Sequence, residues 1–196
     1  MYESCIKRLL DLILSLAACV VLAIPMGIIA LWIKKDSPGP VFFKQRRVGR
    51  GKKCFNILKF RTMRGDTPHD VPTHLLKNAD SYITKSGAFL RRTSLDELPQ
   101  FFNVLKGDMS LVGPRPEIPF HVEHFKEEIP RYLVRQQVRP GLTGWAQING
   151  LRGDTDIAER IRYDIWYIEN WTVALDIKIL FRTVFGGKMV NDEKIQ

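Results

Sequence analysis

The chain has 196 residues, of which 45% are hydrophobic and 26% charged, and its formal net charge is +9. This composition excludes a disordered or collagen-like chain, and the length suits one domain with at most a small appendage. The charge is uneven: residues 1–33 carry net 0, residues 34–64 net +10 and residues 65–196 net −1. All of the excess directly follows the most apolar stretch, so the basic balance does not by itself indicate nucleic-acid binding.

A run of 22 residues without a charged side chain covers positions 12–33. As a straight helix it is about 33 Å long, enough to cross a bilayer core of about 30 Å. Pro25 removes a backbone hydrogen bond inside the run, and basic residues flank both ends, with Lys7 before it and Lys34 after it. A re-entrant hairpin keeps both basic ends on the cytoplasmic side and a single span keeps only one, but the residues alone leave both topologies open.

The rest of the chain alternates short strands, loops and amphipathic helices. Two strand-like segments flank a glycine turn and predict a β-hairpin. Apolar residues at helical spacing predict four helices, the first starting at Asp96 and ending at Gly107. In chain order, we expect strands at 41–48 and 53–60, a surface loop at 65–80, a helix at 96–106, a helical segment at 120–137 broken at Pro130, a glycine-rich loop at 139–150, and helices at 156–170 and 172–185.

The last of these helices, at 172–185, is apolar over much of its surface and is preceded by Trp171. A helix buried in the core is the commoner explanation of such a pattern. A helix lying in the membrane interface also fits, because Trp171, Lys178 and Arg182 are suitable interfacial anchors.

Two adjacent carboxylates, Asp96 and Glu97, stand at a predicted helix start. The plain explanation is helix capping, because Ser94 and Glu97 have capping-box spacing. However, a cap at Ser94 puts Pro99 where a helical amide is needed, so a helix that begins at Asp96 fits better. The functional explanation is a catalytic pair, since a carboxylate at a helix N-terminus stays ionised and is able to coordinate Mg²⁺ or attack phosphorus.

Arginines near this pair are candidate phosphate ligands. Arg91 and Arg92 precede the carboxylates, and Arg115 lies between Pro114 and Pro116. A guanidinium holds phosphate oxygens in bidentate fashion, and the flanking prolines stiffen the backbone that presents Arg115. A structural ion pair is an equally good explanation of Arg115 from residue chemistry alone.

Several motifs, taken in order, resemble the bacterial sugar transferases, the monotopic polyprenyl-phosphate phosphoglycosyl transferases. They are the apolar N-terminus with Pro25, KFRTM at 59–63, SLDELPQ at 94–100, NVLKGDMS at 103–110, GPRP at 113–116 and RPGLTG at 139–144. The resemblance runs from about residue 3 to about residue 185. The chain is similar to a minimal member of the family, a catalytic unit without additional membrane helices.

The resemblance implies a mostly helical α+β fold. Residues 1–36 are expected to form a re-entrant helix-break-helix hairpin in the membrane, with the break at Ile24-Pro25. Residues 37–196 are expected to form a cytoplasmic catalytic domain with a small β-hairpin and several amphipathic helices at the membrane interface. The implied location is the cytoplasmic face of a bacterial inner membrane.

The resemblance also implies a reaction. Such enzymes move a phosphosugar from a UDP-sugar to undecaprenyl phosphate and release UMP, which primes glycan synthesis. Carried onto this sequence, Asp96 forms a phosphosugar-aspartyl intermediate in a ping-pong reaction, and Glu97 assists as a metal ligand or by handling a proton. Asp96 and Glu97 are the expected Mg²⁺ ligands. The expected substrate-binding residues are Lys59, Arg61, Arg91, Arg115 and Arg139.

Two other functions stay open at the level of sequence. A membrane-tethered, non-enzymatic binder of anionic lipid or nucleic acid needs only the basic stretch at 34–64. A glycosyltransferase that moves the sugar alone releases UDP in place of UMP. On the favoured interpretation, the partners are a UDP-sugar, undecaprenyl phosphate and the membrane, with no nucleic acid.

Overall fold

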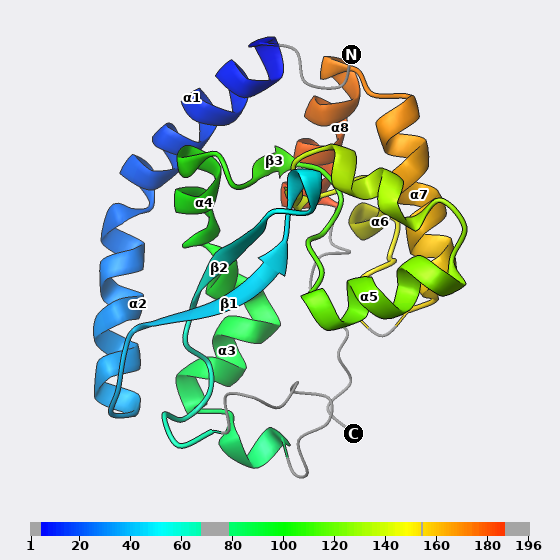
Figure 1. The fold of residues 1–196 in the computed structure, drawn as a ribbon. Coiled ribbons are helices and arrows are strands. Elements are labelled where there is room, and N and C mark those ends of the chain that lie inside the picture. Colours follow the sequence, from blue (N-terminus) through cyan, green and yellow to red (C-terminus); the bar gives the residue numbers. More distant parts are fainter. Residues whose placement is uncertain (1–4, 68–78, 154, 187–196) are drawn as a thin grey trace.

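The computed structural model describes residues 5–67, 79–153 and 155–186. A bent pair of N-terminal helices runs along one side, a long β-hairpin crosses the middle, and the C-terminal helices pack on the other side (Figure 1). The elements in chain order are α1 (Cys5–Val21), α2 (Ala23–Asp36), β1 (Phe42–Val48), η1 (Arg50–Lys52), β2 (Cys54–Phe60), η3 (Ala79–Tyr82), α3 (Lys85–Thr93), η4 (Leu95–Glu97), α4 (Gln100–Lys106), β3 (Ser110–Val112), α5 (Pro119–Glu128), η5 (Tyr132–Gln137), β4 (Gly141–Thr143), α6 (Trp145–Ile148), α7 (Ile157–Glu169) and α8 (Val173–Phe185). The predicted α+β, mostly helical class is confirmed, while most of the loop expected at 65–80 lies outside the described residues.

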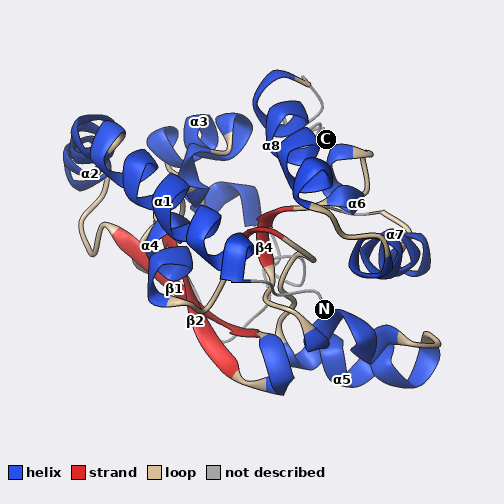
Figure 2. Cartoon of the chain, turned by 90° about the horizontal axis from the view of Figure 1, so that it is seen from above, coloured by secondary structure: helices blue, strands red, loops and turns tan. Residues whose placement is uncertain are grey.

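The predicted β-hairpin is confirmed. Strands β1 and β2 pair antiparallel from Phe42 opposite Phe60 to Val48 opposite Cys54. At the turn, Gly51 has φ +62°, a left-handed conformation that glycine adopts without steric cost. Figure 2 shows a further strand pairing that the sequence pattern missed, the short parallel pair of β3 and β4. Strands of three residues are too short to show a period-two pattern, so residues 141–143 were expected only as loop.

The apolar N-terminal segment is two helices that meet at a bend of 59°. Neither helix alone has the length and apolar character to cross a membrane, whereas the bent pair meets that test when taken together. The break falls at Leu22 and not at the expected Ile24-Pro25. Pro25 explains the shift: it lacks an amide hydrogen, and its ring would meet the carbonyl of Val21 in a continuous helix. Pro25 is therefore accommodated in the first turn of α2.

Polar side chains attach the first turns of α1 to the globular part. Lys7 is 3% exposed, and its ammonium donates to Asp176 of α8 at 2.6 Å. Arg8 donates to the carbonyls of Val104 and Leu105 at the end of α4, at 2.8 and 3.1 Å. Of the flanking basic residues that the sequence offered as a topology signal, Lys7 is therefore an internal contact, whereas Lys34 is exposed.

The far end of the helix pair is attached to the same globular part. Ile29 and Ile33 of α2 pack in one apolar cluster with Phe60 and Leu90. At the end of α2, the Asp36 carboxylate accepts hydrogen bonds from the amide and hydroxyl of Ser86 at the start of α3, at 2.8 and 2.7 Å. Both ends of the pair thus contact one domain.

The outward faces of these helices are apolar. Large hydrophobic side chains that are more than half exposed include Ile6, Leu9, Ile13, Leu16, Val20, Val21, Ile24, Ile28 and Leu31. Helix α8 is buried on one side and exposed on the other. Ile179 is fully buried in the core, while Ile177, Phe181, Val184 and Phe185 are 60–71% exposed. Exposed apolar faces on α1, α2 and α8 suit contact with lipid better than with water.

Packing of α3 and α4 on the hairpin positions the segment between them. A Cβ added at Gly87 of α3 would lie 2.0 Å from the Thr62 carbonyl oxygen, so this close approach requires glycine. On α4, the Asn103 side-chain amide bonds to the backbone of β2: its oxygen accepts from the Leu58 amide at 2.9 Å and its nitrogen donates to the Asn56 carbonyl at 2.8 Å. The turn between α3 and α4 is consequently held against β2.

We predict that Lys7→Gln destabilises the protein by about 3–5 kcal/mol, because it leaves the buried Asp176 carboxylate without its cation. Denaturation of the purified protein in detergent micelles measures this loss. The matched control is Lys35→Gln, an exposed lysine of α2, which is expected to change stability by less than about 0.5 kcal/mol. Equal stability of the two variants would contradict the prediction.

Candidate active site

The two carboxylates lie in η4, a single 3-10 turn between α3 and α4. Ser94 ends α3 in the left-handed conformation, with φ +56°, and the amide of Glu97 donates to the carbonyl of Ser94 at 3.2 Å. Helix α4 begins only at Gln100, after Pro99. The expected helix start at Asp96 is therefore wrong. Pro99 has no amide hydrogen to continue a helix, so the turn closes before it.

Glu97 is the centre of the site. Its carboxylate contacts three cations that come from different segments: Lys59 of β2 at 2.7 Å, Arg115 at 2.7 Å and Arg152 at 3.2 Å. Burial opposes ionisation of Glu97, but the charges of Arg115, Lys59 and Arg152 together hold its pKa well below the usual range. Glu97 is accordingly a permanent anion with both oxygens committed to cations, which makes it a poor general base.

Asp96 differs from its neighbour. Among the described residues, its carboxylate has one ion pair, with the Lys59 ammonium at 3.6 Å. Burial raises the pKa of Asp96, the Lys59 charge lowers it less strongly, and the Glu97 charge raises it further. The expectation that helix dipoles lower this pKa is wrong for the free protein, because Asp96 is not at the start of an α-helix and desolvation prevails. Opposite pKa shifts in adjacent carboxylates are a common feature of functional sites.

The structure brings only some of the predicted substrate-binding residues to the carboxylates. Lys59 and Arg115 lie on Glu97 as described. Arg91 donates from Nε to the Thr62 hydroxyl at 2.9 Å, and Arg139 donates from Nε to the Gly107 carbonyl at 2.9 Å. Those two bonds give Arg91 and Arg139 structural contacts in the free protein.

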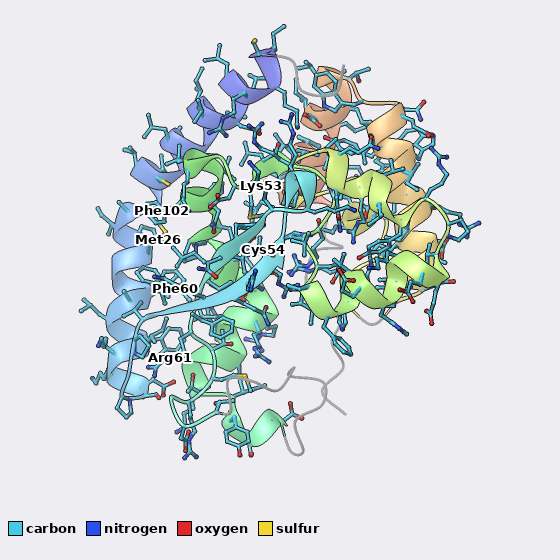
Figure 3. All side chains as sticks on the ribbon, in the orientation of Figure 1. Met26, Lys53, Cys54, Phe60, Arg61 and Phe102 are labelled. Atoms are coloured by element: carbon cyan, nitrogen blue, oxygen red, sulfur yellow. The ribbon has the colours of Figure 1, made fainter. Side chains whose placement is uncertain are left out.

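Arg61 is directed elsewhere. Its guanidinium is buried and donates to the carbonyls of Ser37 and Pro38, in the linker between α2 and β1. Figure 3 shows Phe60 and Arg61 at the end of the hairpin beside α2, and Lys53 and Cys54 at its other end. The hydrogen bonds of Arg61 account for a basic residue at this position without any ligand, because they satisfy backbone carbonyl groups that no helix or strand pairs.

Arg152 is the site residue that the sequence did not reveal. It follows α6 in an irregular segment, and its guanidinium donates to the Ser94 hydroxyl at 3.3 Å besides contacting Glu97. Three cations therefore face two carboxylates, which leaves the cluster with one net positive charge. No residue pattern marks Arg152, because its position depends on how the loop after α6 folds back over η4.

Within the described segments, no cluster of three or more His, Cys, Asp or Glu side chains forms a ready-made metal site. Mg²⁺ in phosphate-transferring enzymes is often held by one or two carboxylates together with substrate phosphates. Asp96, with its single cation contact, fits that role. Glu97 fits it less well, because its three cations already neutralise it.

The family model of the bacterial sugar transferases matches residues 2–188. The chain is 48% identical over 186 residues to a UDP-glucose:undecaprenyl-phosphate glucose-1-phosphate transferase of Escherichia coli (strain K12), covering 93% of this chain and 40% of that protein. It is 44% identical over 182 residues to a UDP-N-acetylgalactosamine-undecaprenyl-phosphate N-acetylgalactosaminephosphotransferase of Aeromonas hydrophila, covering 91% of this chain and 43% of that protein.

A shorter relative matches almost end to end. The exopolysaccharide production protein PSS of Rhizobium leguminosarum bv. phaseoli is 46% identical over 188 residues, covering 91% of this chain and 93% of that protein. The chain therefore belongs to the bacterial sugar transferase family, as the motifs indicated. It spans about two fifths of the length of the Escherichia coli and Aeromonas relatives.

We predict that the Asp96 carboxyl titrates above an ordinary aspartate and that Lys59→Gln raises its pKa further, because the variant removes the nearest cation. Carboxyl ¹³C NMR of aspartate-labelled protein measures both pKa values, with Asp96→Asn assigning the signal. Lys44→Gln, an exposed lysine on β1, is the matched control and should leave the titration unchanged. A fall of the pKa in Lys59→Gln is the result that contradicts this electrostatic account.

Proposed function

We propose that this chain transfers a phosphosugar from a UDP-sugar to undecaprenyl phosphate and releases UMP, the first step in building a bacterial glycan. The main support is the arrangement of the site: a buried carboxylate, Asp96, stands beside three cations that Glu97 holds together. The names of the relatives specify this class of reaction, with glucose in one and N-acetylgalactosamine in another. The sugar itself is not part of the proposal.

In the first half of the reaction, a carboxylate oxygen of Asp96 attacks the sugar-linked phosphorus of the UDP-sugar. A bond from that oxygen to phosphorus forms, the bond from phosphorus to the oxygen bridging the two phosphates breaks, and UMP leaves with the bonding electrons. Lys59, Arg115 and Arg152 lie where they neutralise the diphosphate, which otherwise repels an anionic nucleophile.

In the second half, an oxygen of undecaprenyl phosphate attacks the same phosphorus. The bond to Asp96 breaks, and the carboxylate is regenerated. Because burial of Asp96 outweighs the nearby positive charges of Lys59, Arg115 and Arg152, Asp96 is less stabilised as an anion than Glu97. A carboxylate of that kind is the better nucleophile and the stronger metal ligand of the pair.

Mg²⁺ fits this scheme as a cofactor held by Asp96 together with the substrate phosphates. When bound, it supplies charge neutralisation at the transferring phosphoryl group. Glu97 is able to join as a ligand where substrate phosphates draw its cations away. Arg61, Arg91 and Arg139 stay predictions as substrate contacts, and their bonds in the free protein support positioning roles for them.

The acceptor lipid requires a membrane location, and we propose that residues 1–36 form a re-entrant hairpin in the cytoplasmic leaflet of a bacterial inner membrane. Both ends of the α1–α2 pair dock on one globular domain, through Lys7 and Arg8 at one end and Asp36 at the other. A straight span would put those two ends on opposite sides of the bilayer. The exposed apolar faces of α1, α2 and α8 support contact with lipid.

The non-enzymatic alternative has less support. A nucleic-acid or lipid binder needs the basic stretch at 34–64 to be free, yet Arg47, Lys59 and Arg61 of that stretch make internal contacts with Pro116, Glu97 and the 37–38 linker. We therefore expect the membrane and the two phosphate-bearing substrates as partners, and no nucleic acid.

We predict that purified protein with Mg²⁺ and a UDP-sugar carrying ³²P in the sugar-linked phosphate yields a labelled protein adduct without any lipid acceptor. Asp96→Asn should abolish the adduct and lower turnover by about three orders of magnitude or more, because the nucleophile is removed. Asp66→Asn, an exposed aspartate, is the matched control. Release of UDP, or an adduct that persists in Asp96→Asn, would rule out this mechanism.

We also predict that both ends of the helix pair face the cytoplasm. In a variant with all cysteines replaced by serine, a single cysteine is restored at position 5 or introduced at Lys35. Both single-cysteine proteins should resist a membrane-impermeant maleimide in intact cells whose outer membrane is permeable, and both should react after lysis of the inner membrane. Labelling of one end alone in intact cells would show a membrane span.

A further inference from the structure

A second buried carboxylate, Glu117, lies directly after the Pro-Arg-Pro segment and has no role in the reaction described above. Its side chain is 10% exposed. Three guanidiniums converge on it from separate elements: Arg160 of α7 at 3.4 Å, Arg135 of η5 at 3.9 Å and Arg47 of β1 at 4.0 Å. Such a concentration of buried charge is costly unless each group is well paired.

Two of these arginines also hold the backbone that presents Arg115. Arg135 donates to the carbonyl oxygen of Arg115 at 2.7 Å, and Arg47 donates to the carbonyl oxygen of Pro116 at 3.0 Å. Arg135 is fixed in turn by the buried Asp164 of α7 at 2.8 Å. These hydrogen bonds hold the backbone carbonyl groups of Arg115 and Pro116 in place, and the Arg115 side chain extends to Glu97.

The third arginine holds the backbone that presents Arg152. Arg160 donates to the carbonyl oxygen of Gly153 at 2.5 Å and to the hydroxyl of Thr155 at 2.9 Å. Gly153 directly follows Arg152, so these bonds tie the loop that carries Arg152 to α7. Glu117 thus connects, through its cations, the two segments that supply the arginines of the site.

Glu117 is suited to this role because its charge is constant. Burial opposes its ionisation, but the hydrogen bond with His121 and the charges of Arg135, Arg47 and Arg160 outweigh burial and lower the pKa to about 2. It therefore stays anionic over the range in which phosphate transfer takes place. A fixed anion with three forked donors forms a connected network in which each bond restricts its neighbours.

We propose that Glu117 is a positioning residue for the transfer reaction: through Arg135 and Arg47 it fixes Arg115, and through Arg160 it fixes Arg152, so that both guanidiniums meet the Glu97 carboxylate. The inference rests on the proposed function and deepens it. Its physical basis is that a small displacement of a charge-neutralising group costs much of its effect on the rate.

A double-mutant cycle tests the connection through Arg160. Arg160→Gln is made in the wild-type protein and in Arg152→Gln, and kcat/KM is measured by release of radiolabelled UMP. If Arg160 acts through Arg152, its substitution should lower kcat/KM about tenfold in the wild type and by less than about twofold in Arg152→Gln. A similar loss in both backgrounds would mean that Arg160 is merely structural and would overturn the proposal.

A second double-mutant cycle, with Arg135→Gln made in the wild type and in Arg115→Gln, tests the connection through Arg135. The expected outcome and the contradicting outcome are the same as for Arg160 and Arg152. Combining Arg160→Gln with Arg115→Gln sharpens the result, because Arg160→Gln should still lower kcat/KM about tenfold in that background. The matched control is Arg162→Gln, an exposed arginine on the same helix as Arg160, which is expected to leave kcat/KM unchanged. Thermal denaturation of every variant shows that the compared proteins are folded.

Glu117→Gln tests both connections at once, because Glu117 contacts the arginines of both. It should lower kcat/KM in the wild type but add no further loss to a protein that already carries Arg115→Gln and Arg152→Gln, whereas additive loss would overturn the proposal. Failure of the proposed function is distinguishable, because it appears as a wild-type protein that releases no UMP. If the wild type is active but the losses of kcat/KM in the double-mutant cycles are additive, the positioning role is refuted and the proposed function is not.

Discussion

The Glu97 carboxylate determines the geometry of the site, because three cations from distant parts of the chain converge on it. Lys59 comes from the hairpin, Arg115 from the segment before α5, and Arg152 from the loop after α6. A buried ion pair with one cation adds little net stability, but a buried anion with three cations fixes where those cations lie. Asp96 is adjacent to Glu97 in the chain and therefore lies in the positive electrostatic environment that the cations around Glu97 create.

The α1–α2 helix pair, which we propose lies in the membrane, is attached to the same globular part as the site. Helix α1 reaches α8 through the Lys7–Asp176 ion pair, and α2 reaches α3 through Asp36 and Ser86. Because α3 leads into the turn that carries Asp96, the position of the helix pair is coupled to the position of the site. The proposed function joins a water-soluble nucleotide sugar to a lipid phosphate, and such a coupling would fix the reacting groups relative to the membrane surface.

The concentrated positive charge of residues 34–64 divides between two roles. Arg47, Lys59 and Arg61 point inward, where they organise the backbone and the carboxylates. Lys34 and Lys44 are exposed, and in the proposed membrane location a basic residue near an anionic leaflet would gain about 1 kcal/mol. On the proposed function, the stretch serves both phosphate chemistry and contact with lipid headgroups.

The sequence by itself determined the β-hairpin, the C-terminal helices, the apolar N-terminal segment and the adjacency of Asp96 and Glu97, because periodicity and local motifs are properties of neighbouring residues. It also marked Lys59 and Arg115. Only the tertiary structure decided that the carboxylates lie in a 3-10 turn, that burial raises the pKa of Asp96 while cations lower that of Glu97, and that Arg152 completes the site. Those features depend on desolvation and on contacts between segments far apart in the chain, which no local pattern encodes.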